Sequence, residues 1–273
     1  MEQLRTGIPV DEVTFDQILH LEHHGPDTYV GIAPKYPWGR IFGGQVIAQA
    51  LRAALHTVDD EFAPHSLHAY FIRGGTHAEP IRFEVDRLRN GRSFVARSVV
   101  ARQSSGAILH LSASFQIDEP EAADVTPVAM PDAPDPDAAP DEGWGGLAER
   151  RKVLVENGRV LSWIRMGRTP AIADPRDAAC ALAYISDTVM SEPPRSIHPD
   201  RPQREEFVRT FVGASLDHTM HFHRACDPTE WVLSDAAAHT LVNSRGLSTG
   251  RLFSAGGIHV ATISQEILIR KKT

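Results

Sequence analysis

Cysteine is nearly absent from this chain of 273 residues, which has only Cys180 and Cys226. Two cysteines are too few for a disulfide framework, and these two lack metal-ligand spacing. The chain also lacks a run of 18 apolar residues, so we expect no transmembrane helix. Residues 1–7 lack an apolar signal core, and the chain does not end on the peroxisomal Ser-Lys-Leu address. We therefore expect a cytoplasmic protein.

Basic side chains are outnumbered as well. The chain has 28 Lys and Arg against 35 Asp and Glu, which gives a formal net charge of −7. This balance argues against broad binding of nucleic acid, whose phosphates need clustered positive charge. A local basic patch could still hold an anionic ligand.

One segment, residues 118–143, contains no Lys or Arg but has six prolines and nine acidic residues. Proline interrupts helices and sheets, and like charges repel one another, so the segment is predicted to be an extended linker. We therefore expect an N-terminal domain at 1–117, the linker at 118–143 and a C-terminal domain at 144–273.

A similar pattern occurs on both sides of this linker. Residues 65–73 (HSLHAYFIR) correspond to residues 215–224 (SLDHTMHFHR), and residues 109–116 (LHLSASFQ) correspond to 258–265 (IHVATISQ). Both pairs are separated by 149 or 150 positions, and both follow a candidate helix. Two pairs at one separation predict a duplicated domain, in which the seam between the halves is a natural place for a site.

Each half has the pattern of one helix followed by an antiparallel meander. In the first half an amphipathic helix is predicted from Phe42-Gly43-Gly44 to about Val58, with strands near 65–73, 80–89, 93–104 and 107–116. Hairpin turns are predicted at Asn90-Gly91 and at Ser104-Ser105-Gly106.

The second half repeats this order. Asp174 and Pro175 are the N-cap and first residue expected of a helix that runs to about Met190. Strands are predicted near 213–224, 229–243, 246–254 and 258–270. A helix wrapped by an antiparallel sheet, present twice, is an α+β fold with double hotdog architecture.

Several motifs resemble the two halves of the acyl-CoA thioesterase II (TesB-like) family. The N-terminal motifs are residues 40–46 (RIFGGQV), 65–73 and 113–116 (ASFQ), and the C-terminal motifs are 183–187 (AYISD), 215–224 and 264–266 (SQE). The resemblance covers roughly residues 25–117 and 145–270, in order. It implies a double hotdog enzyme that hydrolyses acyl-CoA to free fatty acid and coenzyme A without a cofactor. It also implies a homo-oligomer, either a dimer or a tetramer.

Three polar residues of the second half are candidates for the chemistry. Asp187 lies near the end of a largely apolar helix, where a buried carboxylate is costly unless it is paired, although it could also meet water. Ser215 has no Gly-x-Ser-x-Gly elbow and no evident base, since His218 is expected on the opposite strand face. Gln265 cannot act as a base and can only orient other groups. The resemblance makes Asp187, Ser215 and Gln265 the family's catalytic trio.

These residue types suit hydrolysis of a thioester. We expect Asp187 to take a proton from water as general base, while Ser215 and Gln265 hold that water. Backbone N–H groups beside Gly43 and Gly44, at a helix N-terminus, are candidates for stabilising the oxyanion.

Other polar groups are weaker candidates. His218, His221 and His223 lie close together in sequence, but no further ligands accompany them, so we expect no metal site. His221 occupies a position where the family commonly has Trp, so acyl preference is expected to differ, and His65 is interpreted as a hydrogen-bonded structural residue. Arginines that could meet the phosphates of coenzyme A are Arg89, Arg92, Arg97, Arg102, Arg245 and Arg251.

Two other functions fit the same fold. One is a noncatalytic module that binds acyl-CoA, and the other is a hydratase or dehydratase acting on acyl thioesters. The second would need a proton-transfer motif with histidine, which the sequence does not offer in a convincing context. The presence of all three members of the trio favours the hydrolase.

Overall fold

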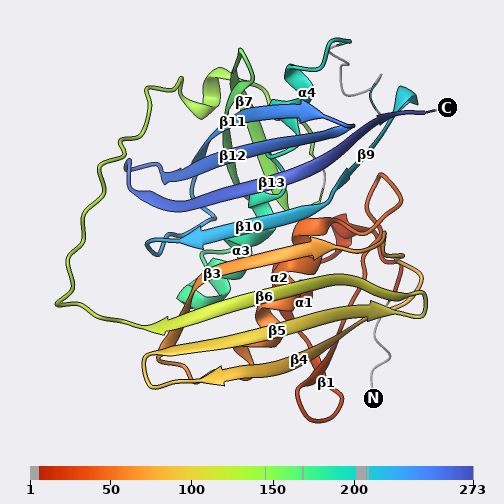
Figure 1. Ribbon diagram of the computed structural model, residues 1–273, viewed down its shortest axis with the longest axis vertical. Helices are drawn as coiled ribbons and strands as arrows, with labels where there is room; N and C mark the ends of the chain where they lie inside the picture. The colour runs from red at the N-terminus through yellow and green to blue at the C-terminus, as the bar shows by residue number, and fades with distance from the viewer. Residues whose placement is uncertain (1–5, 145, 168, 201–206, 208, 273) are drawn as a thin grey trace.

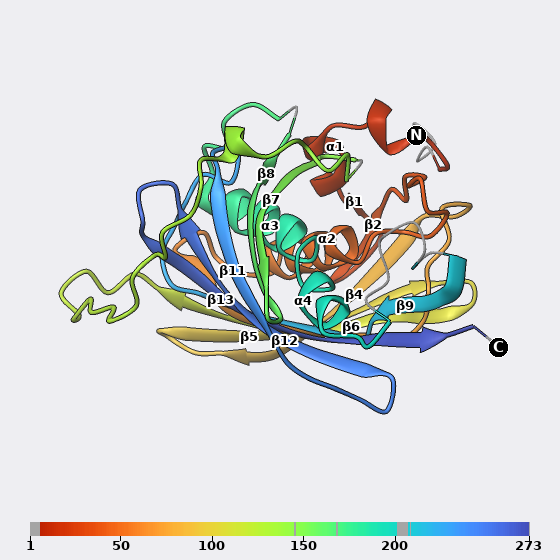
Figure 2. The ribbon, with the colours of Figure 1, turned by 90° about the horizontal axis from the view of Figure 1, so that it is seen from above.

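The computed structural model describes residues 6–144, 146–167, 169–200, 207 and 209–272. These residues form one continuous antiparallel sheet that curves around two central helices (Figures 1 and 2). The strand order is β1-β2-β4-β5-β6-β3-β10-β13-β12-β11-β8-β7, and β9 pairs with β13. This arrangement confirms the α+β double hotdog expected from the sequence.

The first half contains the helix and the four strands predicted for it, together with η1, α1, β1 and β2. Its helices are η1 (Val10–Glu12), α1 (Phe15–Leu19) and α2 (Gly43–Leu55), and its strands are β1 (Glu22–His23), β2 (Thr28–Gly31), β3 (Phe62–Phe71), β4 (Ile81–Asn90), β5 (Phe94–Gln103) and β6 (Gly106–Ile117). Both predicted hairpin turns are confirmed. Helix α2 ends at Leu55, earlier than expected, because the Thr57 hydroxyl donates to the Ala54 carbonyl and closes the last turn.

The second half contains a hairpin that the sequence analysis missed. Its elements are η2 (Pro136–Ala138), β7 (Ala148–Glu156), β8 (Arg159–Met166), α3 (Pro175–Ser186), α4 (Glu192–Ser196), β9 (Phe211–Ser215), β10 (Asp217–Phe222), β11 (Val232–Val242), β12 (Arg245–Ser254) and β13 (His259–Lys271). Asn157-Gly158, both with positive φ, forms the turn between β7 and β8. This Asn-Gly pair is a strong hairpin signal that could have predicted both strands.

Helix α3 begins where the sequence predicted, with the Asp174 side chain accepting from the backbone N–H of Arg176 at 2.8 Å. It ends at Ser186 rather than near Met190. The Thr188 hydroxyl donates to the Ile185 carbonyl at 2.6 Å, and this side-chain bond competes with another helical turn. Asp187 is therefore the C-cap residue of α3.

The two halves join in two layers. In the sheet, β3 pairs antiparallel with β10, with Ala69 opposite His218. Behind it, α2 and α3 pack against each other with the N-terminus of each beside the C-terminus of the other, as the Gly44–Asp187 and Arg176–Leu55 hydrogen bonds indicate. The pseudo-dimer seam expected from the repeat therefore runs through both layers.

The two ends of this helix seam differ chemically. At one end, Arg176 donates to the Leu55 and Val58 carbonyls, at 2.6 and 3.1 Å, and Arg52 pairs with Asp177. At the other end, the backbone N–H of Gly44 donates to Asp187. The first end is closed by guanidinium groups, whereas the second contains a carboxylate.

Residues 118–143 run along the outside of the second half, as the left side of Figure 1 shows. Val128, Met130 and Ala133 cover the outward side chains Leu161 and Trp163 of β8. The Trp163 indole N–H donates to the Pro134 carbonyl at 2.8 Å. This segment therefore protects apolar surface on the outside of the sheet, and the domain limits drawn around it stay a prediction.

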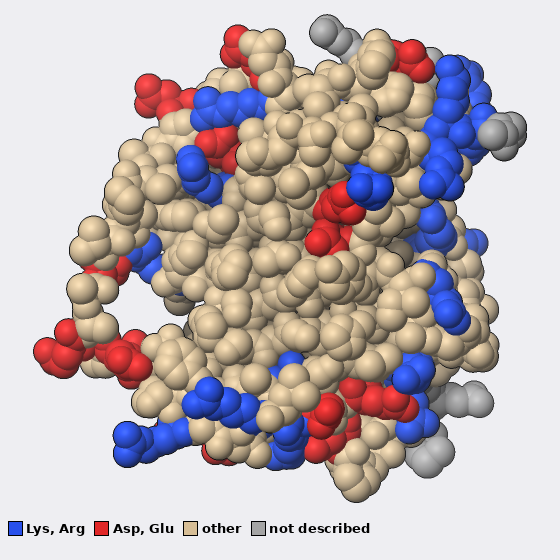
Figure 3. Space-filling view, in the orientation of Figure 1, with Lys and Arg blue, Asp and Glu red and all other residues tan. Residues whose placement is uncertain are grey.

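The outer face of the sheet is turned toward the viewer in Figures 1 and 3, and it has few charges at its centre. Lys and Arg gather instead along the right edge, beside β9 and the C-terminus (Figure 3). No helix within the described ranges has the length and apolar character needed to cross a bilayer.

Candidate active site

Asp187, Ser215 and Gln265 meet at the Asp187 end of the helix seam. Ser215 Oγ donates to Asp187 Oδ1 at 3.2 Å, and Gln265 Nε2 lies 3.0 Å from the same oxygen and 2.8 Å from Ser215 Oγ. Residues separated by 28 to 78 positions in sequence thus share one hydrogen-bond cluster. The structure brings together all three predicted site residues.

The first half supplies a fourth contact. The backbone N–H of Gly44, in the first turn of α2, donates to Asp187 Oδ2 at 2.9 Å. Each carboxylate oxygen therefore accepts at least one hydrogen bond, and the positive end of the α2 dipole faces the negative charge. These contacts compensate for the burial of Asp187, which is only 7 % exposed.

Gly43 and Gly44 are required by close packing at this point. A Cβ on Gly43 would lie 2.7 Å from Asp187 Oδ2, and a Cβ on Gly44 would lie 2.3 Å from the backbone oxygen of Tyr184. The sequence analysis offered this helix N-terminus as an oxyanion site. The structure instead uses the Gly44 N–H to bind the carboxylate.

The side chain of His218 does not point in the direction expected from the sequence, because a β-bulge lies beside Ser215. Ser215 pairs with Ile267 and Thr219 pairs with Ser264, so four steps along one strand oppose three along β13. The extra residue is Leu216, and it shifts the alternation of side chains by one. His218 consequently points to the same side as Ser215, not to the opposite side as predicted.

His218 is fully buried and was not predicted as a site residue. Its Nδ1 lies 2.5 Å from Gln265 Oε1, and its Nε2 lies 2.9 Å from Ser186 Oγ. His221 is exposed, and His223 contacts Thr262 and His259 instead. Within the described ranges, no group of three or more His, Cys, Asp or Glu side chains is arranged to hold a metal ion.

A cavity of about 420 Å³ opens beside the trio. Asp187 and Ser215 line it, while Gln265 lies behind them and is 1 % exposed. Its apolar wall includes Trp38, Phe42, Val46, Phe71, Trp144 and Ile267. The volume and lining suit an elongated apolar group next to a polar reaction centre.

Aromatic rings hold part of this wall in place. Trp38 stacks on Tyr36 at 5.0 Å between ring centroids, and Phe42 meets the Tyr184 ring edge-on at the same separation. The Tyr36 and Tyr184 hydroxyls lie 2.9 Å apart. Burial raises the pKa of both phenols, that of Tyr184 to about 12, so neither exchanges protons near neutral pH.

The cysteines are equally poor nucleophiles. Burial raises the pKa of the Cys180 thiol well above its ordinary value, and burial with the nearby Asp227 raises that of Cys226 to about 12. His65 is bonded to Ser114 at 2.7 Å, and burial lowers its pKa, with a smaller effect from His221. The expected structural role of His65 agrees with this contact.

The arginines at the cavity are not the ones suggested by sequence. Arg40, Arg73 and Arg195 line it. The guanidinium of Arg40 donates to the Gly213 carbonyl at 3.1 Å, and that of Arg73 donates to the Ser105 carbonyl. Arg40 and Arg73 are exposed, so each can also reach an anionic group at the cavity.

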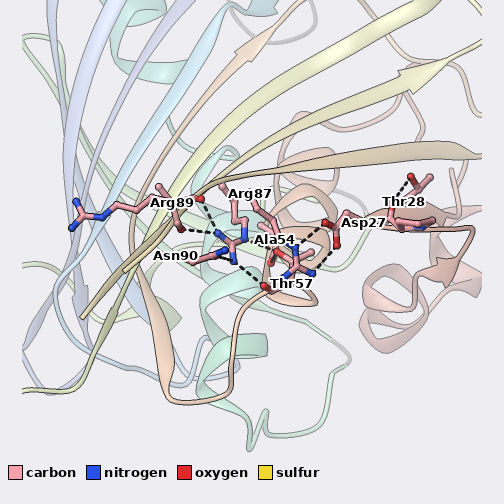
Figure 4. Close-up of polar contacts among 10 residues, drawn as sticks. Asp27, Thr28, Ala54, Thr57, Arg87, Arg89 and Asn90 are labelled. Carbon is pink, nitrogen blue, oxygen red and sulfur yellow. Dashed lines mark hydrogen bonds and ion pairs between the residues drawn. The ribbon is translucent and has the colours of Figure 1, made fainter. Parts of the chain in front are cut away.

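Among the arginines suggested by sequence, Arg97 is buried and engaged by protein partners. Its guanidinium is 2 % exposed and donates to Thr57 Oγ1 at 2.7 Å, to Asn90 Oδ1 at 2.7 Å and to the Arg89 carbonyl at 2.9 Å. Figure 4 labels these three partners, Thr57, Asn90 and Arg89. Burial lowers its pKa, and its donors connect the end of α2 to the β4–β5 hairpin. Arg102 pairs with Glu84 and Arg245 with Glu266, and none of these four residues lines the cavity.

Comparison with known proteins identifies the class to which this fold and site belong. Residues 32–116 match the model of the acyl-CoA thioesterase N-terminal domain, and residues 122–269 match that of the C-terminal domain. The chain belongs to the acyl-CoA thioesterase II (TesB-like) family. The sequence-based assignment to the acyl-CoA thioesterases is thereby confirmed.

Individual relatives match over nearly their full length. Acyl-CoA thioesterase 2 of Haemophilus influenzae is 32% identical, over 93% of this chain and 96% of its own. Human acyl-coenzyme A thioesterase 8 is also 32% identical, over 93% of this chain and 88% of its own. The crystal structure of acyl-CoA thioesterase II TesB2 from Mycobacterium marinum superposes with a TM-score of 0.83 at 35% identity, covering 95% of this chain and 99% of that one.

Proposed function

We propose that this acyl-CoA thioesterase hydrolyses fatty acyl-CoA with Asp187 as general base. The proposal is supported mainly by one observation: Ser215 and Gln265 both donate to the same Asp187 oxygen at the edge of an apolar cavity. A water molecule beside that carboxylate would meet Ser215 Oγ at the cavity, while Gln265, which lies behind, would hold Asp187 and Ser215 in place. Proximity and orientation of this kind lower the barrier to attack on a carbonyl.

In the proposed reaction the water oxygen attacks the thioester carbonyl carbon while its proton passes to Asp187. The tetrahedral intermediate collapses with cleavage of the C–S bond, and the proton on Asp187 passes to the departing thiolate. The products are the fatty acid and the free thiol of coenzyme A. Because the Gly44 N–H is engaged by Asp187, the N-terminus of α2, where Gly43 lines the cavity, would act on the oxyanion only through its dipole.

The residues that line the cavity also argue against the alternative function, that of a hydratase or dehydratase. Such an enzyme would need a histidine at the substrate, and among the described residues that line the cavity there is none. His218 is behind Gln265 and faces the core. Self-association into a dimer or tetramer, which the resemblance implies, stays a prediction.

Thiol release from a panel of acyl-CoAs of graded chain length tests the proposal directly. We expect Ser215→Ala and Gln265→Ala each to lower kcat about ten- to a hundredfold with little change in KM, because each removes one hydrogen-bond donor that orients the Asp187 carboxylate. Ser264→Ala is the matched control, since Ser264 adjoins Gln265 but faces the other side of β13 and should behave as the wild type. Wild-type kcat in both trio variants would contradict the proposal.

A second prediction concerns the coenzyme A moiety. Arg40→Ala and Arg73→Ala should each raise KM for acyl-CoA about three- to fivefold, because an exposed ion pair contributes up to about 1 kcal/mol. The same variants should leave KM unchanged for an acyl N-acetylcysteamine thioester, which lacks phosphates. Arg92→Ala, an exposed position on the β4–β5 turn, is the control. An equal rise in KM for both substrates would show that these arginines act on cavity shape and not on phosphate.

A further inference from the structure

His218 extends the polar cluster of the active site into the protein core. It lies on β10 directly opposite Ala69, at the center of the seam between the two halves. Its side chain is 0 % exposed, so both ring nitrogens depend on protein partners. Those partners are Gln265 Oε1 at 2.5 Å and Ser186 Oγ at 2.9 Å.

The hydrogens in this chain of contacts can be assigned from Asp187. An ionised carboxylate only accepts, so the Gln265 group that faces Asp187 Oδ1 must be the NH2 and not the oxygen. Gln265 Oε1 therefore faces His218, and the nearby Nδ1 must carry a hydrogen to donate to it. The amide orientation and the histidine tautomer thus determine each other.

Ser186 completes the assignment. In a neutral imidazole with its hydrogen on Nδ1, the other nitrogen is an acceptor. The Ser186 hydroxyl, 2.9 Å from Nε2 and 3.0 Å from the Ala183 carbonyl, then shares its hydrogen between these two acceptors. The donors of His218 and Gln265 now both point toward Asp187, and no two acceptors face each other between His218 and Asp187.

The opposite arrangement has a specific cost. If the Gln265 amide rotated by 180°, its oxygen would face Asp187 Oδ1 at 3.0 Å, and two acceptors would repel each other. Ser215 Oγ would also lose the amide donor that lies 2.8 Å away. A histidine with its hydrogen on Nε2 would favour this rotated amide, because its bare Nδ1 would attract the NH2 group.

We propose that His218, held by Ser186, is a positioning residue that fixes the orientation of the Gln265 carboxamide toward Asp187 and Ser215. The expected effect of His218 on kcat rests on the proposed function. The hydrogen-bond assignment is independent of that function. His218 does not touch the cavity and acts only through Gln265.

The tautomer can be measured without any assay of activity. In protein labelled with 15N-histidine, two-bond 15N–1H couplings distinguish a ring protonated at Nδ1 from one protonated at Nε2. The His218 signals are assigned by their loss in His218→Asn. We expect Nδ1–H in the wild type and a shift toward Nε2–H in Ser186→Ala. A wild-type His218 protonated at Nε2 overturns the proposal.

Kinetic variants test the effect on the reaction. His218→Leu removes the donor and should lower kcat about tenfold or more while KM changes less than about threefold. His218→Asn places an amide NH2 at the same number of bonds from Cα as Nδ1 and should recover most of that loss. Equal kcat in the Leu and Asn variants overturns the proposal, because a purely structural role would not depend on the donor.

Ser186→Ala keeps the inference testable if His218→Leu fails to fold. We expect it to lower kcat about threefold at unchanged KM. Ser248→Ala is its matched control, because Ser248 is also a fully buried serine whose hydroxyl donates to a backbone carbonyl, that of Met190 at 2.8 Å. Equal kcat in the two serine variants counts against the proposal.

Failure of the mechanism and failure of this inference give different results. Full activity in Asp187→Asn together with an Nδ1–H signal from His218 would refute the general base and leave the hydrogen-bond assignment intact. An inactive Asp187→Asn together with an Nε2–H signal would support the general base and refute the positioning role.

Discussion

Asp187→Asn is expected to lower kcat for acyl-CoA hydrolysis about a thousandfold, within the range attributed to general base catalysis. The amide has nearly the same size as the carboxylate but cannot take a proton from water. It still offers one oxygen to the donors that surround Asp187, so the cluster should remain folded. Acyl-CoA affinity, measured by calorimetry on the inactive variant, should therefore stay within about threefold of the wild type.

Asp177→Asn is the matched control for this experiment. Asp177 is a partly buried carboxylate at the other end of the helix seam, where it pairs with Arg52. Its replacement should affect stability and leave kcat near the wild-type value. Asp187 would be removed from the mechanism if its Asn variant were as active as the Asp177 variant.

Gly44→Ala is expected to cause the largest structural effect of any single methyl group at the site. The new Cβ would lie 2.3 Å from the Tyr184 carbonyl oxygen, a backbone atom that cannot rotate away. The N-terminus of α2 must then move from the end of α3, which breaks the Gly44–Asp187 hydrogen bond. We expect a loss of about 3 kcal/mol in the free energy of unfolding and about a hundredfold in kcat.

Denaturant unfolding and thiol release measure the two effects of this substitution. Gly256→Ala is the control, because the nearest atom to a Cβ there is the Ser254 hydroxyl oxygen at 3.8 Å. A Gly44→Ala protein with unchanged stability would mean that the two helices do not approach each other as closely as the structure has them.

The repeated fold was predictable because its signals are local. The apolar spacing in α2, the N-cap at Asp174 and the Asn90-Gly91 turn each depend on a few neighbouring residues. The β7–β8 hairpin was missed although Asn157-Gly158 indicated it. Charged residues such as Arg150 and Arg151 interrupt the alternation expected in β7, and partners such as Asp137 on the linker satisfy them only in the folded protein.

The candidate site could be predicted only in part. The family motifs contain Asp187, Ser215 and Gln265, and the structure brings these residues together. The direction of His218 depended on a bulge at Leu216 that arises from pairing with β13, so counting residues along one strand gave the wrong face. The cavity arginines were missed because Arg40 and Arg73 come from loops, where no periodic pattern indicates direction.

Because the two ends of the α2–α3 seam differ chemically, the two halves of the chain have different roles. A symmetric pair of hotdog units offers two equivalent positions, and in this chain one holds Asp187 while Arg176 fills the other with bonds to the Leu55 and Val58 carbonyls. We therefore expect one catalytic centre in each polypeptide. Substitutions near Arg176 should change the stability of the packing between the two halves of the chain. Substitutions near Gly44 should change kcat as well.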